Sequence, residues 1–398
     1  MRSARKRAVA LAAAAVTLGG TAGFVAVPAQ AGERGGHGVP PGHRGRLLHT
    51  APLTNAAALP SAAANRKIGY TSEGVGGKRI TVTGTVAIPK GKAPRGGWPV
   101  ISWAHGTTGT ADVCAPSADT PTGPAHDYLA YSERYLDKWV AQGYAVVQTD
   151  YEGLGTPGGH PYMNGVSHAN TVVDIVRAAR EMDRRIGRDW FAVGHSQGGQ
   201  AALFTAAQRQ TPRDVRLKGS LALAPGSFIS QTPGYVRAGL PGAQGALPFL
   251  FVMLTGSQAA DPSLVPEDLV TEEAAPLVEA TRTSACTAQL RELSADLPPE
   301  NVFRPDADLA PLENYLRSQE PLGLALKVPT FVLQGSADTQ VTPGATQTVV
   351  ADLCTRYGGI TYGEFEGADH RGLMDVSFEE ALDYVRDLRA GRTPPSAC

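Results

Sequence analysis

The chain has 398 residues, of which 42% are hydrophobic, and its 36 Lys and Arg nearly balance 37 Asp and Glu, giving a formal net charge of −1. This length suits one large domain with an insertion, or two domains. After the N-terminal segment there is no basic cluster and no run of 18 apolar residues. Nucleic acid is therefore not expected as a partner, nor an integral membrane segment in the mature chain.

Residues 1–31 are typical of a secretory signal peptide. Basic residues between Arg2 and Arg7 precede an apolar run at 8–27, and Ala29-Gln30-Ala31 supplies the small residues that a signal peptidase needs. We therefore expect cleavage near Ala31 and a secreted protein, with an uncleaved membrane anchor as the alternative. Residues 32–59, rich in Gly, Pro, Ala and Arg, are expected to form a flexible leader into the fold.

Strands and helices are expected to alternate along the rest of the chain. Alternating apolar and polar residues predict a strand at 79–88. Short apolar runs predict buried strands at 99–103, 144–149, 189–193, 217–223, 328–333 and 360–365. Helical spacing predicts helices at 135–142, 170–182, 200–208 and 378–388. This order is typical of an α/β fold, in which helices cover both faces of a mostly parallel sheet.

One interval interrupts the alternation. Between residues 223 and 328 lie roughly a hundred residues with many prolines and no clear strand, too long a stretch for a simple loop. We expect a structured insertion at 228–320 between two core segments, 60–227 and 321–398. The apolar run at 247–254 is expected to form the core of this insertion or, alternatively, to line a channel for an acyl chain.

Ser196 lies in Gly194-His195-Ser196-Gln197-Gly198, after a predicted strand and before a predicted Ala-rich helix. Gly-x-Ser-x-Gly between a strand and a helix is the pattern of a nucleophile elbow. Because the turn is tight, the two outer positions must lack bulk. Ser196 is therefore the candidate nucleophile.

His370 is the candidate general base that a serine nucleophile requires. In this architecture the nucleophile comes first along the chain, then the acid, then the histidine. Of nine histidines only His370 follows Ser196, and it comes shortly after the predicted strand at 360–365. A histidine in a surface loop without function is the alternative.

Asp338 is the candidate acid that orients the base. It comes directly after the buried strand that begins at residue 328. Asp306, Asp308 and Asp352 satisfy the chain order, but none follows the end of a strand.

Two backbone N–H groups are the candidate donors to the oxyanion of acyl transfer. One belongs to Gln197, directly after the nucleophile, and the other to Thr107, in the loop after the strand at 99–103. Thr108 and Gly109 are alternatives to Thr107. This chemistry requires no metal and no organic cofactor. Asp150 and Glu152, after another strand, are expected to brace their loop.

Four cysteines remain in the mature chain: Cys114, Cys286, Cys354 and Cys398. An even number in an exported protein suggests two disulfides, with three connectivities. No paired Cys or His spacing typical of a metal site is present.

Four segments together resemble the secretory lipase family of α/β-hydrolases: Trp103-Ala-His-Gly-Thr-Thr-Gly109, Asp150-Tyr-Glu-Gly-Leu-Gly155, Gly194-His-Ser-Gln-Gly-Gly199 and the Asp338/His370 pair. The resemblance runs from about residue 60 to the C-terminus. It implies an α/β-hydrolase fold with a large lid between the sixth and seventh core strands, and action on carboxylic esters, commonly triacylglycerols. It also implies the disulfides Cys114–Cys286 and Cys354–Cys398.

We therefore expect a secreted serine carboxylic-ester hydrolase, a triacylglycerol lipase or esterase of lipid catabolism. Its partners are expected to be an ester or lipid substrate and, transiently through the lid, a lipid surface. A polyester hydrolase, a plant-cell-wall esterase and a peptidase on the same fold are alternatives. A non-catalytic binding protein that kept the fold is a further alternative.

Overall fold

The computed structural model describes residues 44–209 and 212–398. The expected signal peptide, residues 1–31, and residues 32–43 of the expected leader lie outside this part of the chain. Each helix in the described part of the chain is too short or too polar to cross a membrane.

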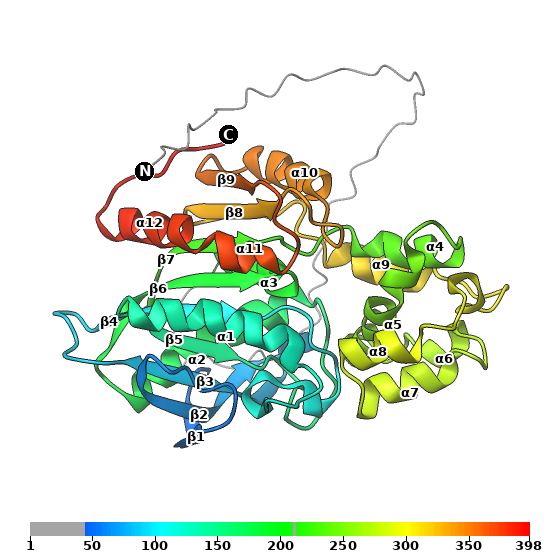
Figure 1. Ribbon diagram of the computed structural model, residues 1–398, viewed down its shortest axis with the longest axis horizontal. Helices are drawn as coiled ribbons and strands as arrows, with labels where there is room; N and C mark the ends of the chain where they lie inside the picture. The colour runs from blue at the N-terminus through cyan, green and yellow to red at the C-terminus, as the bar shows by residue number, and fades with distance from the viewer. Residues whose placement is uncertain (1–43, 210–211) are drawn as a thin grey trace. The chain divides into compact units, whose positions relative to one another are not determined.

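A nine-stranded sheet forms the core of the described chain, in the order β1-β2-β3-β5-β4-β6-β7-β8-β9 (Figure 1). The strands are β1 (Leu47–Pro52), β2 (Ala62–Glu73), β3 (Arg79–Pro89), β4 (Trp98–Ala104), β5 (Ala145–Thr149), β6 (Ile186–His195), β7 (Arg216–Leu223), β8 (Thr330–Gly335) and β9 (Ile360–Phe365). From β1 to β5 neighbouring strands are antiparallel. From β5 to β9 they are parallel. The prediction of a mostly parallel α/β-hydrolase sheet is confirmed.

Helices cover both faces of this sheet. They are α1 (His126–Ala141), α2 (Gly165–Met182), α3 (Gln197–Ala207), α10 (Pro343–Cys354), α11 (Gly372–Val376) and α12 (Phe378–Arg389). Successive residues of a strand point to opposite faces. Accordingly, Ile101 and Trp103 of β4 pack in an apolar cluster with α1, α11 and α12. Val100 and Ala104 of the same strand pack in a second cluster with α2, α3 and α10.

The insertion between β7 and β8, here called the cap (residues 228–320), contains only helices and turns as regular elements. Its helices are α4 (Thr232–Arg237), α5 (Ala243–Ala260), α6 (Pro266–Leu269), α7 (Ala275–Thr283), α8 (Thr287–Leu293) and α9 (Ala310–Ser318). They lie together beside the sheet in Figure 1. The apolar run at 247–254 falls in α5, and Leu247, Leu250 and Phe251 are buried in a third apolar cluster made mostly of cap residues. The cap therefore has a core of its own.

Two expectations about the first half of the chain are wrong. Residues 47–52, expected to belong to a flexible leader, form β1, which pairs with β2. Helix α1 begins at His126, not near residue 135, and its first two turns bury Tyr128, Leu129 and Ser132. No side chain caps this helix at Ala125, so its start carries no local sequence signal.

The disulfide Cys114–Cys286 joins the core to the cap across 172 residues. Cys114 lies after β4 and Cys286 directly precedes α8. Backbone contacts support the junction, since Gly109 pairs with Cys286 and Thr287 donates its N–H to the Thr108 carbonyl at 2.9 Å. The segment that follows β4 is thus held against the cap.

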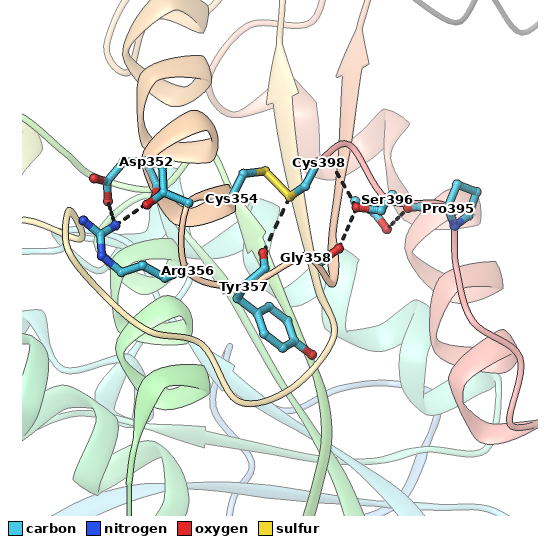
Figure 2. The surroundings of a disulfide bond; sticks show 10 residues. Asp352, Cys354, Arg356, Tyr357, Gly358, Pro395, Ser396 and Cys398 are labelled. Carbon is cyan, nitrogen blue, oxygen red and sulfur yellow. Dashed lines mark hydrogen bonds and ion pairs between the residues drawn. A yellow bond between two sulfur atoms is a disulfide. The ribbon is translucent and has the colours of Figure 1, made fainter.

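The second disulfide, Cys354–Cys398, joins the end of α10 to the last residue of the chain (Figure 2). The tail is also held by hydrogen bonds from Ser396 Oγ to the Gly358 carbonyl and from Thr361 Oγ1 to the Pro395 carbonyl, each 2.6 Å long. Both cysteine pairs are those that the family resemblance implied.

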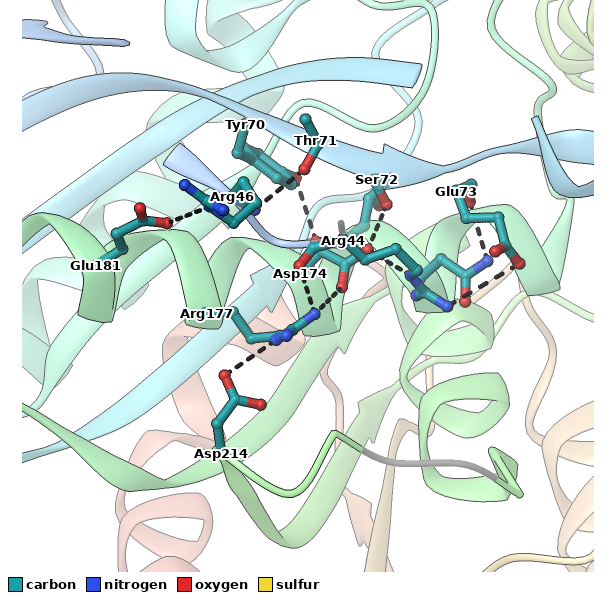
Figure 3. A network of polar contacts seen from close by, with 12 residues as sticks. Arg44, Arg46, Tyr70, Thr71, Ser72, Glu73, Asp174, Arg177, Glu181 and Asp214 are labelled. Atoms are coloured by element: carbon teal, nitrogen blue, oxygen red, sulfur yellow. Dashed lines mark hydrogen bonds and ion pairs between the residues drawn. The ribbon is translucent and has the colours of Figure 1, made fainter. Parts of the chain in front are cut away.

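A buried carboxylate connects α2 to β2 and to the segment before β1 (Figure 3). Asp174 is fully buried and accepts hydrogen bonds from Ser72 Oγ at 2.7 Å and from Arg44 Nε at 2.9 Å. Arg177 lies 3.8 Å from its second oxygen. A buried charge requires such partners, and they fix the N-terminal strands on the main sheet.

Candidate active site

Ser196 occupies a strained turn between β6 and α3. Its φ of 59° and ψ of −118° lie where non-glycine residues are rarely found, and its side chain does not cap the helix that follows. The turn is fixed by neighbouring strands, because Ser196 N donates to the Leu223 carbonyl at 2.9 Å and Gly226 N donates to the Ser196 carbonyl at 3.0 Å. Strain retained by surrounding contacts is common at functional sites.

The glycines of the elbow allow the strand and helix to touch. A Cβ at Gly198 would overlap the carbonyl oxygen of Ala104, and a Cβ at Gly194 would overlap the carbonyl oxygen of Gly198. Both obstacles are backbone atoms, which cannot rotate away.

We expect Gly198→Ala to lower the free energy of unfolding by about 4 kcal/mol or more, because the new methyl group displaces β4 from the elbow. Denaturant unfolding measures this loss. Gly245→Ala is the matched control, since a Cβ at Gly245 in α5 would meet nothing within 4 Å. That variant should be neutral or slightly more stable, because Gly is a poor helix former. Equal unfolding curves for the two variants would contradict the steric argument.

Asp338 and His370 are joined beyond the ends of two neighbouring strands. Asp338 follows β8, His370 follows β9, and His370 Nδ1 lies 2.7 Å from Asp338 Oδ2. Both side chains are buried. The other oxygen of Asp338 accepts the N–H groups of Gln340 and Val341 at 2.8 and 2.9 Å, which fixes the carboxylate. With Nδ1 as the donor to Asp338, Nε2 is the ring nitrogen that can take a proton.

A chain of hydrogen bonds connects the elbow to the loop after β4 and to the loop of His370. Gly106 N donates to the Tyr128 hydroxyl at 2.7 Å, and Tyr128 Oη lies 3.1 Å from His195 Nδ1. His195 Nε2 lies 2.8 Å from the His370 carbonyl oxygen, and the two imidazole rings are 4.5 Å apart. His195 is the neighbour of Ser196. This chain therefore holds the candidate base loop beside the candidate nucleophile.

We expect Tyr128→Phe to reduce stability by about 1–3 kcal/mol, because Gly106 N–H and His195 Nδ1 would be left buried without a partner. If these hydrogen bonds also align the catalytic groups, kcat should fall by roughly tenfold with little change in KM. Tyr131→Phe, one turn along α1 and only partly buried, is the matched control. Unchanged stability and kcat in Tyr128→Phe would show that these hydrogen bonds contribute neither to stability nor to catalysis.

The other buried histidines are poor bases. Burial lowers the pKa of His105 to about 4 and that of His160 to about 3. Burial also lowers the pKa of His168 and His195 well below the usual value. An imidazole with so low a pKa accepts a proton weakly at neutral pH. The geometry and these shifts favour His370 as the base.

The two candidate oxyanion donors lie in segments that touch the elbow. Gln197 is the first residue of α3, and its side-chain nitrogen lies 3.1 Å from His160 Nε2. Thr107 Oγ1 lies 2.8 Å from the Tyr162 hydroxyl. Among the described residues, the backbone N–H groups of Gln197 and Thr107 have no hydrogen-bond partner. They are available to an incoming oxygen, and so is the N–H of Thr108, which meets the cap through its carbonyl oxygen as the acceptor from Thr287 N.

Asp150 and Glu152 brace loops, as the sequence suggested. Buried Asp150 accepts hydrogen bonds from Thr83 Oγ1 and from the backbone and side chain of Ser117. Glu152 accepts from Val75 N at 3.0 Å and from Ser167 Oγ. Both carboxylates are therefore engaged within the core.

A cavity lies between the cap and the loops after β4 and β5. Its lining includes Thr110 and His160 from the core and Thr255, Gln258 and Arg282 from the cap. Because His160 lines this cavity and contacts the Gln197 side chain, the cavity lies near a candidate oxyanion donor. Polar side chains are prominent among its lining residues, but the greater part of its wall is apolar.

Sequence reasoning missed Tyr128, His160 and His195 as supports of the site. Each contacts residues distant in the chain, so no local motif marks their roles. Only His195 carried a signal, as the neighbour of Ser196 in the sequence.

Comparison with known proteins identifies the family of the chain. Residues 123–377, more than half of the chain, match the family model described as serine aminopeptidase, S33. No curated protein matches the chain in sequence.

Solved structures share the fold at low sequence identity. Candida antarctica lipase A in its closed state is 19% identical with a TM-score of 0.74, covering 89% of this chain and 84% of the lipase. A rice cell wall degrading esterase, LipA from Xanthomonas oryzae, is 20% identical with a TM-score of 0.68, covering 88% of this chain and 100% of the esterase. A putative hydrolase from Legionella pneumophila is 18% identical with a TM-score of 0.67, at 88% and 100% coverage. At this identity the likeness shows the fold alone.

Proposed function

The chain belongs to the family of hydrolases described as serine aminopeptidase, S33, and from this premise we propose that it is a secreted carboxylic-ester hydrolase with Ser196 as its nucleophile. The observation that carries the proposal is the strained Ser196 turn beside the hydrogen-bonded pair of Asp338 and His370. The three residues have the chain order and the strand-end positions of a nucleophile, acid and base.

The proposed reaction has two halves. His370 Nε2 takes the proton of Ser196 as Oγ attacks the ester carbonyl, and Asp338 stabilises the imidazolium that forms. His370 then gives the proton to the leaving alcohol, which departs and leaves an acyl group on Ser196. In the second half His370 activates water, which attacks the acyl-enzyme and releases the acid.

We assign the stabilisation of the negative charge that develops on the carbonyl oxygen to the backbone N–H groups of Gln197 and Thr107. Each such donor contributes about 3 kcal/mol to transition-state stabilisation. The Gln197 side chain contacts His160, and the Thr107 side chain contacts Tyr162. These contacts support the proposal that both donors are held in position before substrate binds. Every group required for the proposed reaction belongs to the protein, so it needs no cofactor.

The buried apolar cluster of the cap reaches the oxyanion loop, which favours a substrate with a long apolar acyl chain. The apolar cluster of the cap includes Tyr162 and Met163 of the core. Tyr162 contacts Thr107, and a Cβ at Gly226, whose N–H bonds to Ser196, would lie 2.9 Å from Met163 Cε. Acyl methylenes that this cluster takes up would each stabilise binding by about 0.8 kcal/mol. Triacylglycerols or simpler fatty esters are therefore the proposed substrates.

Two rival substrates have specific support. The family description names an aminopeptidase, and the same three residues could cleave an amide. One structural neighbour is named as a cell wall degrading esterase, and the polar side chains in the lining of the cavity beside His160 would suit a sugar-bearing alcohol.

A substrate panel separates these candidates. We would compare p-nitrophenyl esters from C2 to C16, tributyrin, olive oil, feruloyl esters and aminoacyl p-nitroanilides, with Ser196→Ala as the blank. The proposal expects a kcat/KM that rises with acyl length over part of the ester series and negligible anilide cleavage. A preference for anilides would establish the peptidase, and a preference for feruloyl esters the cell-wall esterase. No turnover together with no labelling by a fluorophosphonate would support a binding protein.

Export and division into domains are part of the same proposal. Two disulfides are typical of proteins from oxidising compartments, which supports a signal peptide at 1–31 and a secreted product. We assign the hydrolase core to 60–227 and 321–398 and the lid to residues 228–320, with transient lipid contact through the lid. Edman sequencing of the secreted protein should find a new N-terminus near residue 32.

A further inference from the structure

Three potential metal ligands converge outside the candidate active site, at the start of α1. Asp119 follows a short turn (Pro116–Ala118), His126 is the first residue of α1, and Glu133 lies two turns further along the same helix. One ligand atom from each residue lies within 4.8 Å of the other two. Asp119 Oδ2 is 2.7 Å from His126 Nδ1, and the Glu133 carboxyl is within hydrogen-bonding reach of Asp119. We refer to these three residues as the Asp119 cluster.

No Lys or Arg of the described residues forms an ion pair with the Asp119 cluster. Asp119 is buried, and Glu133 is partly buried. Among the ion pairs of the described residues, Asp119 is paired only with His126, and Glu133 is in none. The adjacent Arg134 instead contacts Asp375 and the ring of Tyr131. Two buried or half-buried carboxylates close together are unfavourable unless they share a proton or a cation balances them.

The loop between Asp119 and His126 is folded closely around the carboxylate. Gly123 N donates to the Thr120 carbonyl at 2.8 Å, and His126 N donates to the Gly123 carbonyl at 3.1 Å. A Cβ at Gly123 would lie 2.7 Å from Asp119 Oδ1. The backbone thus holds Asp119 and His126 in place, which lowers the entropy cost of forming a site.

We propose that the Asp119 cluster binds a divalent transition-metal cation of the Zn²⁺ class, with Asp119, His126 and Glu133 as ligands and water in the remaining position. One imidazole nitrogen and two carboxylates suit Zn²⁺, whereas Ca²⁺ and Mg²⁺ prefer oxygen ligands alone. Binding replaces the proton on the coordinating nitrogen of His126 and releases it to solvent.

The proposed role of this metal is structural. It would tie the loop at 119–126 to α1, whose Asp127 pairs with Arg371, the neighbour of His370, at 3.0 Å. Tyr128, the residue after Asp127, contacts Gly106. The metal would therefore stabilise the support beneath the active-site loops without touching substrate, and the inference stands whether or not the proposed ester hydrolysis is correct.

The test uses the full secreted chain, stripped with a chelator and dialysed. Calorimetric titration with Zn²⁺ and elemental analysis should find about one ion per chain, and thermal unfolding at a hundredfold excess over Kd should show a melting temperature higher by about 3–6 °C. His126→Asn and Glu133→Gln should each weaken Zn²⁺ binding at least about tenfold and abolish most of the thermal shift. Both side chains are only partly buried, so both variants should fold.

His49→Asn is the matched control, because it removes an exposed imidazole on β1 distant in sequence from the cluster. This variant should bind Zn²⁺ as the parent chain does. Equal binding by His126→Asn and the parent, or loss of binding in His49→Asn, would overturn the proposal. A thermal shift with Ca²⁺ as large as that with Zn²⁺ would also overturn it, because His126 would then not be a ligand. Zn²⁺ binding by Ser196→Ala should equal that of the parent, which keeps this test independent of activity.

Discussion

Replacing Ser196 with alanine should lower kcat for ester hydrolysis by about 10⁴-fold or more while the fold survives. The variant removes the hydroxyl oxygen that we propose as the nucleophile, and no other described hydroxyl occupies the elbow. Stability should change little, because the Ser196 side chain caps no helix. Release of strain at a φ of 59° is not expected, since alanine also has a Cβ.

Steady-state rates on a p-nitrophenyl ester and labelling by a fluorophosphonate measure this effect. Ser318→Ala, which removes an exposed hydroxyl from α9, is the control and should keep full activity and labelling. A Ser196→Ala protein with more than a trace of turnover, or one still labelled by the probe, would disprove the assignment of the nucleophile.

Removing the disulfide between core and cap should have the largest effect on stability. The double variant Cys114→Ser/Cys286→Ser opens a loop of 172 residues. The loop-entropy relation assigns about 5 kcal/mol to such a cross-link. The bond also holds the segment with Thr107 against the cap, through the contacts of Thr108 and Gly109 with Thr287 and Cys286. Activity should therefore fall together with stability.

The second disulfide provides the comparison. Cys354→Ser/Cys398→Ser opens a loop of 44 residues, for which the same relation gives about 4 kcal/mol. It frees a tail that lies beside Gly358 and Thr361, away from the loop after β4, so activity at low temperature should persist. Denaturant unfolding and activity at 25 °C measure both variants. Loss of activity in the tail variant alone would contradict the role given to Cys114–Cys286.

The strands of the parallel sheet were the most predictable elements. β9 has the predicted bounds, 360–365, and β4, β5 and β7 differ from prediction by one residue at most at either end. A strand buried on both faces is a short run of apolar residues, so the signal is local. β1 had no such signal, because five of its six residues are exposed. It forms a strand because its backbone pairs with the edge of β2.

Helix starts were less predictable than strands. Helix α1 begins without a capping side chain, and α2 begins at Gly165, a poor helix former, although Asn164 caps it. Packing of Tyr128 and Leu129 against the core decides the first of these. Local propensity could not, because tertiary burial outweighs a weak start signal.

The order of residues along the chain was enough to nominate Ser196, Asp338 and His370 and to favour an α/β-hydrolase. The candidate nucleophile, acid and base each follow the end of a strand. Strand ends can be predicted from the sequence because each buried strand is a local run of apolar residues. The hydrogen-bond chain from Gly106 through Tyr128 and His195 to His370 was decided only in three dimensions, as was the Asp119 cluster. Their members come from different loops and helices, and a contact between distant segments leaves no periodicity in the sequence. Packing alone brings such groups within hydrogen-bonding distance.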